Sequence, residues 1–322
     1  MTDRPLEPET LLALRAARET GALEALMTTA DTPAELAAEA GITRRSAEVL
    51  VAILEAEGFL ERVRATRGET TVYEPTNRAL GFLAKTDVRS IGPVPAALDR
   101  LDRGLELAET LRTGESRPST DLEERHRLAA AATADEAAVR AVVTAACRFA
   151  PDADRVLEVG GAPGRHAVEF AARGRPVTLA DRPSRLAASE SVLAGAPVSR
   201  LEVPGEGPVT TVPADADGPD LVVSIDRTVR NAPGENEALL ESAFDALEPG
   251  GWTVVVDRVA GHSAGASRAA AAALLETPAG RAYDESTYRE WFRTAGFESV
   301  RLEAIPGTDR QAIGGRTPEP TG

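Results

Sequence analysis

Short apolar segments alternate with helix-like segments from residue 154 to the end of the chain. The segments expected to form strands are 155–160, 176–181, 199–204, 220–225, 252–259, 299–305 and 310–315. Helices are expected at 165–173, 184–194, 235–247, 266–276 and 286–295. Apolar strands without strict polar alternation are typical of a sheet that is buried on both faces. The order therefore predicts an α/β fold with a Rossmann-like, mostly parallel, seven-stranded sheet.

A glycine cluster, "VLEVGGAPG", lies between the first expected strand and the following helix. Gly160, Gly161 and Gly164 allow a ligand to approach the backbone closely, and the start of the helix offers free N–H groups. Asp181 ends the next strand, where an acid can accept hydrogen bonds from ribose hydroxyls. This spacing predicts a site for a ligand that contains adenosine.

The acid on the first strand narrows the choice of ligand. Glu158 stands two residues before Gly160, where a carboxylate suits a positive charge or an amino group better than a pyrophosphate. The glycine spacing also differs from the G-x-G-x-x-G pattern of dinucleotide sites. An NAD-dependent oxidoreductase is further disfavoured because Lys85 is the only lysine and the chain has no Tyr-x-x-x-Lys pair.

The first 88 residues predict a winged helix. We expect one helix over 10–30, a second that begins after Thr32 with a capping box to Glu35, and a third over 44–57. Two short β-like segments on either side of the turn at 64–69 would form the wing.

Winged helices often bind DNA, but the charges here do not favour it. The third helix carries Arg44 and Arg45 near its start, together with Glu48, Glu55 and Glu57, and is otherwise mostly apolar. A helix that reads base edges needs polar and basic side chains. We expect this one to pack against protein.

The middle of the chain, 89–150, predicts a helical connector. It contains an amphipathic segment at 94–114, a turn, and one long alanine-rich helix over 121–150. The sequence thus divides into a winged-helix domain at 1–88, a connector at 89–150 and a Rossmann-like domain at 151–322.

The overall charge limits the partners. The formal net charge is −15, which disfavours nucleic acid and anionic lipid. No apolar run is long enough to span a membrane, the N-terminus does not resemble a signal peptide, and Cys147 is the only cysteine. These features favour a reducing cytoplasm and no metal site. The acidic, lysine-poor composition suits a halophile-like surface, although GC-rich codon bias gives a similar composition.

The ordered segments resemble the class I S-adenosylmethionine-dependent methyltransferases, in particular the caffeate/acetylserotonin-type O-methyltransferases. "PAELAAEAGITRRSAEVLVAILEAEGFLERV" is similar to the family's dimerisation domain, and "VLEVGGAPG" to its glycine loop. "LADRPS", "VPGE", "DLVVSIDRTVRNAP", "DALEPGGWTVVVDRV" and "YREWFRTAGFESVRLEA" follow in the family's order.

The resemblance implies S-adenosylmethionine (SAM) as cofactor, a small-molecule acceptor and a homodimer formed through the N-terminal domain. The residues it implies for cofactor binding are Glu158, Gly160, Gly161, Gly164, Asp181, Arg182 and Glu206.

The catalytic residues of the family are only partly matched. Its histidine base falls on Arg230 or Val229, depending on the alignment, and its second supporting glutamate falls on Ala282. Asp257 matches the first supporting glutamate. Arginine stays charged at working pH, so Arg230 cannot replace the base.

Three candidate catalytic residues follow. Arg230 could hold an anionic acceptor, Asp257 could orient a partner, and His262 could act as the substitute base. His166 and His126 read more simply as helix residues.

The favoured function is SAM-dependent methyl transfer to a small molecule, with oxygen as the expected acceptor atom. The alternatives are a SAM-binding protein without activity and a winged-helix transcription regulator with a ligand-sensing domain.

Overall fold

The computed structural model describes residues 6–63, 71–79, 87–213, 216 and 218–319. The chain forms two compact units, Met1–Asp102 and Arg103–Gly322, and each is described by itself. The predicted division at residues 88 and 150 stays a prediction. Among the described residues, no helix has both the length and the apolar character of a membrane span.

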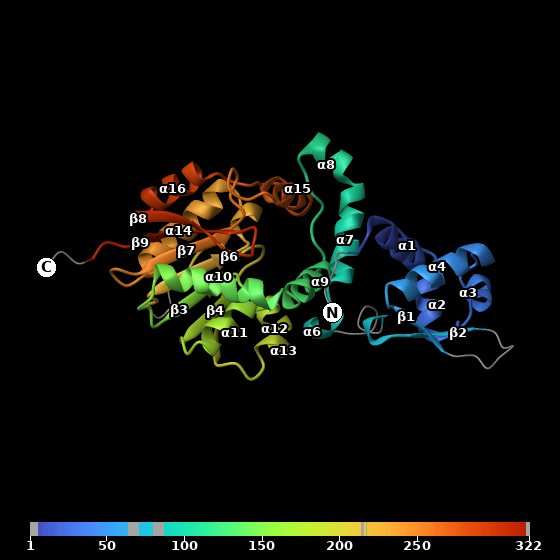
Figure 1. Cartoon of the computed structure of the whole chain (residues 1–322). Coiled ribbons are helices and arrows are strands. Elements are labelled where there is room, and N and C mark those ends of the chain that lie inside the picture. Colours follow the sequence, from blue (N-terminus) through green and yellow to red (C-terminus); the bar gives the residue numbers. More distant parts are fainter. Residues whose placement is uncertain (1–5, 64–70, 80–86, 214–215, 217, 320–322) are drawn as a thin grey trace. The chain divides into compact units, whose positions relative to one another are not determined.

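The first unit begins with two helices, α1 (Pro8–Glu19) and α2 (Ala22–Thr28) (Figure 1). The prediction of one helix over 10–30 is therefore wrong. The break occurs at Gly21, which has a φ of +74° and precedes α2. Glycine adopts this left-handed conformation without steric cost, so the chain can turn between the two helices.

The capping signals of the next two helices are confirmed. α3 (Pro33–Glu39) begins with a capping box in which Thr32 accepts from the Glu35 backbone N–H. In α4 (Arg44–Ala56) the Thr43 hydroxyl accepts from the Ser46 N–H. Such caps pair backbone donors that a helix start would otherwise leave unsatisfied.

An antiparallel hairpin follows, formed by β1 (Leu60–Val63) and β2 (Val72–Pro75). The predicted turn at 64–69 lies outside the described residues. The unit continues through α6 (Val88–Ile91) and into α7 (Val94–Leu105). Its core is formed by buried apolar side chains from several elements, including Leu14, Leu36, Leu54, Phe59 and Leu98.

The second unit contains one seven-stranded sheet, as predicted. Its strands are β3 (Val156–Val159), β4 (Val177–Asp181), β5 (Val198–Glu202), β6 (Leu221–Ile225), β7 (Trp252–Asp257), β8 (Glu298–Ala304) and β9 (Gln311–Arg316). Their order is β5-β4-β3-β6-β7-β9-β8. β9 runs antiparallel to both of its neighbours, and the other pairings are parallel.

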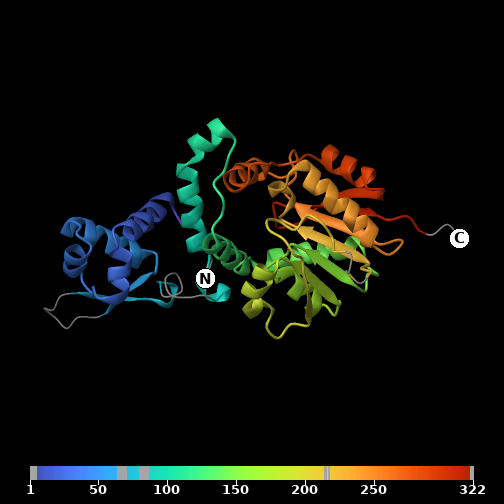
Figure 2. The ribbon, with the colours of Figure 1, turned by 180° about the vertical axis from the view of Figure 1, so that it is seen from behind.

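Helices cover both faces of the sheet (Figures 1 and 2). On one face, α10 (Glu136–Phe149), α11 (Arg165–Ala172), α12 (Pro183–Ala188) and α13 (Glu190–Leu193) contribute to the same buried cluster. On the other face, α14 (Pro233–Ala246) and α16 (Glu285–Thr294) form a second cluster with the sheet. The strands are therefore apolar on both faces, as the sequence pattern requires.

Two predicted helices are each divided into two shorter ones. The segment 121–150 forms α9 (Asp121–Ala132) and α10, because the Asp135 carboxylate caps the Ala138 N–H and starts a new helix. The segment 184–194 is divided at Ser189, between α12 and α13. An alanine-rich sequence does not by itself indicate such a break. A residue that can cap a helix, such as Asp135, does indicate one when it lies in the middle of the sequence.

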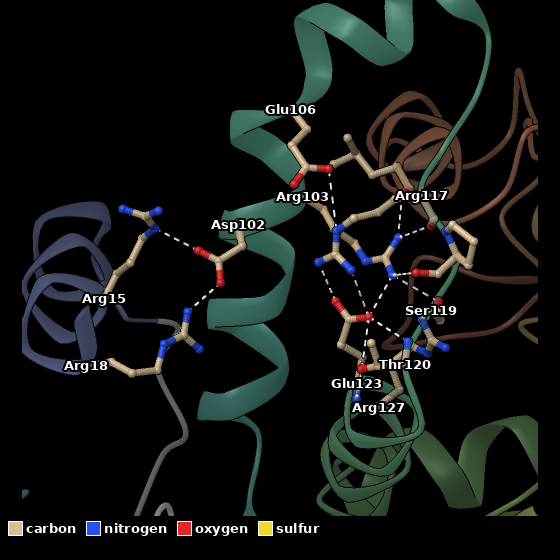
Figure 3. A network of polar contacts seen from close by, with 12 residues as sticks. Arg15, Arg18, Asp102, Arg103, Glu106, Arg117, Ser119, Thr120, Glu123 and Arg127 are labelled. Atoms are coloured by element: carbon tan, nitrogen blue, oxygen red, sulfur yellow. Dashed lines mark hydrogen bonds and ion pairs between the residues drawn. The ribbon is translucent and has the colours of Figure 1, made fainter. Parts of the chain in front are cut away.

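Buried Arg103 connects three segments of the second unit (Figure 3). Its guanidinium donates to the carbonyls of Arg117 and Leu275, each at 3.0 Å, and to Ser119 Oγ at 3.1 Å. It also pairs with Glu123 at 2.9 Å. These contacts join the end of α15 (Ala266–Glu276) and the loop before α9 to the first turn of α9. In the first unit, Asp102 pairs with Arg15 and Arg18.

Glu123 is held in its charged form by this network. Burial by itself would raise its pKa, but hydrogen bonds from Arg117, the Thr120 N–H and Arg103 lower the pKa to about 2. The resulting stabilisation is present above the ordinary value of 4.5 and is lost as the pH falls toward 2.

We predict that Arg103→Met lowers the free energy of unfolding by about 3 kcal/mol at pH 7, because it leaves a buried carboxylate with fewer partners. Urea denaturation measures this change. The difference between variant and wild type should shrink between pH 4.5 and pH 2, as Glu123 becomes protonated.

The control is Arg112→Met, which removes an exposed ion pair with Glu109 on α8 (Leu107–Thr113). It should change stability by less than about 0.5 kcal/mol. Equal effects of the two variants would contradict the role assigned to Arg103.

Candidate functional site

The loop between β3 and α11 requires glycine at specific positions. Gly160 and Gly164 have φ values of +69° and +88°. A Cβ on Gly164 would lie 2.6 Å from Leu193 Cδ2 and 3.0 Å from Leu179 Cδ2. Gly164 therefore allows α11 to begin close to Leu179 of β4 and to Leu193 of α13.

Glu158 lies in the middle of the sheet and is fully buried. A Cβ on Gly161 would lie 2.2 Å from Glu158 Oε1, so the carboxylate lies directly against the bare backbone of the loop. Among the described residues, neither oxygen of Glu158 has a hydrogen-bond partner, although His166 Nδ1 lies 3.5 Å from Oε1. A buried carboxylate without donors is costly, and a ligand that brings donors or positive charge would remove this cost.

The carboxylate faces a cavity of about 340 Å³ within the second unit. Its lining comes from α9, α10, the glycine loop, the first turn of α11, α12, the segment from the end of β6 to Arg230 and the segment before β9. The lining residues are Glu124, Arg127, Leu128, Ala130, Ala131, Ala134, Ala138, Val139, Val142, Glu158, Gly160, Gly161, Ala162, Pro163, Arg165, His166, Arg185, Ile225, Asp226, Arg227, Arg230 and Arg310.

Asp181 is placed beneath the glycine loop. It is fully buried, its Oδ2 accepts from the Ala162 N–H at 3.0 Å, and its Oδ1 accepts from the Arg182 N–H at 2.8 Å. Asp181 therefore fixes the loop to the end of β4, and it is not among the residues that line the cavity. Gly164 is likewise outside the lining.

Arg182 organises the segment that contains Glu206. Its guanidinium donates to the carbonyls of Val203 and Glu206, both at 3.1 Å, and of Pro208 at 2.7 Å. Glu206 is exposed and contributes only its backbone oxygen to these contacts. Neither side chain lines the cavity.

Of the three candidate catalytic residues, only Arg230 lines the cavity. Its Nη1 lies 2.9 Å from Glu276 Oε2, and it is partly exposed. His262 is exposed, and its Nε2 pairs with Glu285 at 2.9 Å.

Asp257 is buried behind the cavity wall. Its Oδ2 accepts from Thr228 Oγ1 at 2.8 Å and from the Val229 N–H at 3.2 Å. Burial, together with the nearby charge of Asp226, raises the pKa of Asp257 to about 6. These contacts hold the 3-10 turn η1 (Thr228–Arg230) against the end of β7.

The sequence analysis missed a bidentate ion pair at the end of β6. Asp226 accepts from Arg310 Nε at 2.8 Å and from Nη2 at 2.6 Å. Burial opposes the charge of Asp226, but Arg310 outweighs burial and holds its pKa below the ordinary value. Asp226 also has a φ of +54°, which is rare for a residue with a side chain and is frequent at functional sites. Asp226 itself could have indicated this ion pair in the sequence, because it is a charged residue that directly follows an apolar strand.

A family model described as a methyltransferase domain matches residues 123–302. The chain therefore belongs to this methyltransferase family. No curated protein sequence matches the chain.

Three solved structures illustrate the likeness of fold. Human N-acetylserotonin methyltransferase in complex with SAM has 20% sequence identity and a TM-score of 0.68, with 96% of this chain and 94% of that chain covered. The mitomycin 7-O-methyltransferase MmcR has 18% identity, a TM-score of 0.68 and the same coverage. PigF with SAH has 18% identity and a TM-score of 0.67, with 96% of each chain covered.

We predict that Gly161→Ala destabilises the protein by about 1–3 kcal/mol, because the new methyl group would overlap Glu158 and force the loop to move. Chemical denaturation measures the change. Gly234→Ala is the matched control, since Gly234 lies in the first turn of α14 with no atom within 4 Å of a new Cβ. That control should be neutral or should stabilise by up to about 1 kcal/mol. If both variants are neutral, the contact between Glu158 and the loop is not tight.

Proposed function

We propose that this chain is a SAM-dependent methyltransferase that transfers a methyl group to an oxygen atom of a small molecule. Membership of the methyltransferase family supports the reaction class. The similar structures named above include one in complex with SAM, one with SAH and one called a 7-O-methyltransferase. The observation that carries the proposal is the buried carboxylate of Glu158 at the cavity wall, which has no hydrogen-bond partner among the described residues.

The residues around the cavity suit this cofactor. Glu158 offers a negative charge to a ligand with an ammonium group and a sulfonium, and Gly160 and Gly161 present backbone without side chains. When bound, SAM supplies a methyl carbon attached to a positively charged sulfur. The carboxylate would therefore regain in the complex the electrostatic partners that it lacks without a ligand.

The remaining walls suit a small acceptor. Residues of α9 and α10 that face the cavity are mostly small or apolar, including Leu128, Ala131, Ala138, Val139 and Val142. Such walls exclude water and leave room for an organic molecule. Holding the acceptor oxygen in line with the methyl carbon supplies most of what this reaction needs from a protein.

We also infer that the predicted winged-helix domain at 1–88 mediates homodimerisation. Leu12 on α1 and Val49 on α4 are each about half exposed, at 50% and 53%, and Arg44 is paired with Glu48. These features favour contact with protein over contact with DNA. Sedimentation equilibrium of the full chain should give about twice the monomer mass of 33.8 kDa.

The net charge of −15 and the single Cys147 support a location in the cytoplasm.

We predict that calorimetry detects binding of S-adenosylhomocysteine (SAH) to the wild-type protein, and that Glu158→Gln weakens this binding at least about tenfold. The substitution preserves the shape of the side chain and removes the charge that pairs with the ligand's ammonium group.

His262→Ala is the control, because His262 lies outside the cavity and should leave SAH affinity unchanged. Transfer of a labelled methyl group from SAM to a panel of phenols, quinols and carboxylates tests the reaction itself. A protein that binds a dinucleotide but shows no heat with SAH would overturn the proposal.

A further inference from the structure

Two arginines of the described residues line the cavity without a direct ion pair to a carboxylate. Among the described residues, Arg165 and Arg227 have neither a hydrogen bond from the side chain nor an ion pair, and Arg165 Nε is buried without an acceptor. The other arginines of the lining are paired. Arg127 and Arg185 pair with Glu124, Arg230 with Glu276, and Arg310 with Asp226.

Arg227 is the more informative of the two. It is half-buried and follows Asp226 at the end of β6. A Cβ on Gly160 would lie 3.0 Å from its Nε, so the guanidinium lies over the glycine loop. Burial and the nearby charge of Arg185 lower the pKa of Arg227 to about 10, although the charges of Asp181 and Glu124 partly oppose them, and Arg227 stays positively charged at neutral pH. A half-buried charge of this kind is costly unless a ligand supplies the opposite charge.

The cofactor can neutralise only one of these two arginines. SAM carries one carboxylate, one ammonium and one sulfonium, and the ammonium can pair with Glu158. Its carboxylate can pair with one guanidinium. The second guanidinium would then have no anion of its own, because the Glu124 and Asp226 carboxylates of the lining are already paired with other arginines.

We propose that the acceptor brings this anion as a carboxylate, and that Arg227 is the residue that binds it; this inference rests on the proposed function. Arg227 shares the segment after β6 with Arg230, so both can face one anionic acceptor. Arg165 is the first residue of α11 and directly follows the glycine loop, and we assign it to the carboxylate of the cofactor. Guanidinium groups bind carboxylates through two parallel hydrogen bonds, which gives direction as well as affinity.

An anionic acceptor also removes the need for a general base. The Asp226 and Glu124 carboxylates line the cavity, but both are paired with arginine, which outweighs burial and keeps each pKa below its ordinary value. A carboxylate needs no deprotonation. Its oxygen forms a bond to the methyl carbon while the carbon–sulfur bond breaks, and the electron pair of that bond stays on sulfur. The products are a neutral methyl ester and a neutral thioether, and no proton moves.

The test titrates SAH-loaded protein with benzoate, 4-hydroxybenzoate and cinnamate, and with their amides. We expect the carboxylates to bind and the amides to bind at least about tenfold more weakly. Arg227→Met should weaken carboxylate binding at least about tenfold and leave SAH affinity within about threefold of wild type. Arg165→Met should weaken SAH binding more than carboxylate binding. Circular dichroism melts confirm that each variant is folded.

Arg125→Met is the matched control, since Arg125 is exposed on α9 and does not line the cavity. It should change neither affinity.

Turnover of 4-hydroxybenzoate gives a second readout, because a methyl ester supports the proposal and a methyl ether contradicts it. Absence of carboxylate binding, or equal binding to Arg227→Met, overturns the inference. A loss of SAH binding in Arg227→Met assigns this arginine to the cofactor instead, and a wild-type protein that does not bind SAH contradicts the proposed function itself.

Discussion

The contact between the Glu158 carboxylate and the bare backbone of Gly161 constrains the rest of the second unit. Moving a carboxylate from water into a sheet costs several kcal/mol unless donors or positive charges compensate. Here the nearest candidate donor is His166 at 3.5 Å, and the loop has no side chain at the point of contact. The loop, its glycines and the cavity are thus arranged around a charge that only a ligand can neutralise well.

The strands and helix starts that could be predicted are those that depend on residues close to one another in the sequence. The seven strands follow from short apolar runs, and the caps at Thr32 and Thr43 follow from residue types at fixed spacing. The helix breaks at Gly21 and Asp135 were missed because alanine and leucine continue the pattern on both sides. The division of the chain within α7, between residues 102 and 103, has no signal in composition at all.

The site was predictable only in part, for a related reason. Glu158 and the glycines are neighbours in the sequence, so their relation to the cavity could be anticipated. Asp257 ends β7 and His262 lies in the loop that follows, but such a position does not fix the direction of a side chain, and neither residue lines the cavity. The pair Asp226–Arg310 depends on the order of the strands in the sheet, which no local pattern contains.

The reversed direction of β9 has a consequence for when this site can form. Because β9 runs against β7, its first residues lie at the edge where the parallel strands end, and Arg310 reaches Asp226 from there. A nascent chain that has emerged only as far as β8 already carries the glycine loop and Glu158, but its Asp226 still lacks Arg310. The lining of the cavity is therefore complete only after Arg310 has left the ribosome.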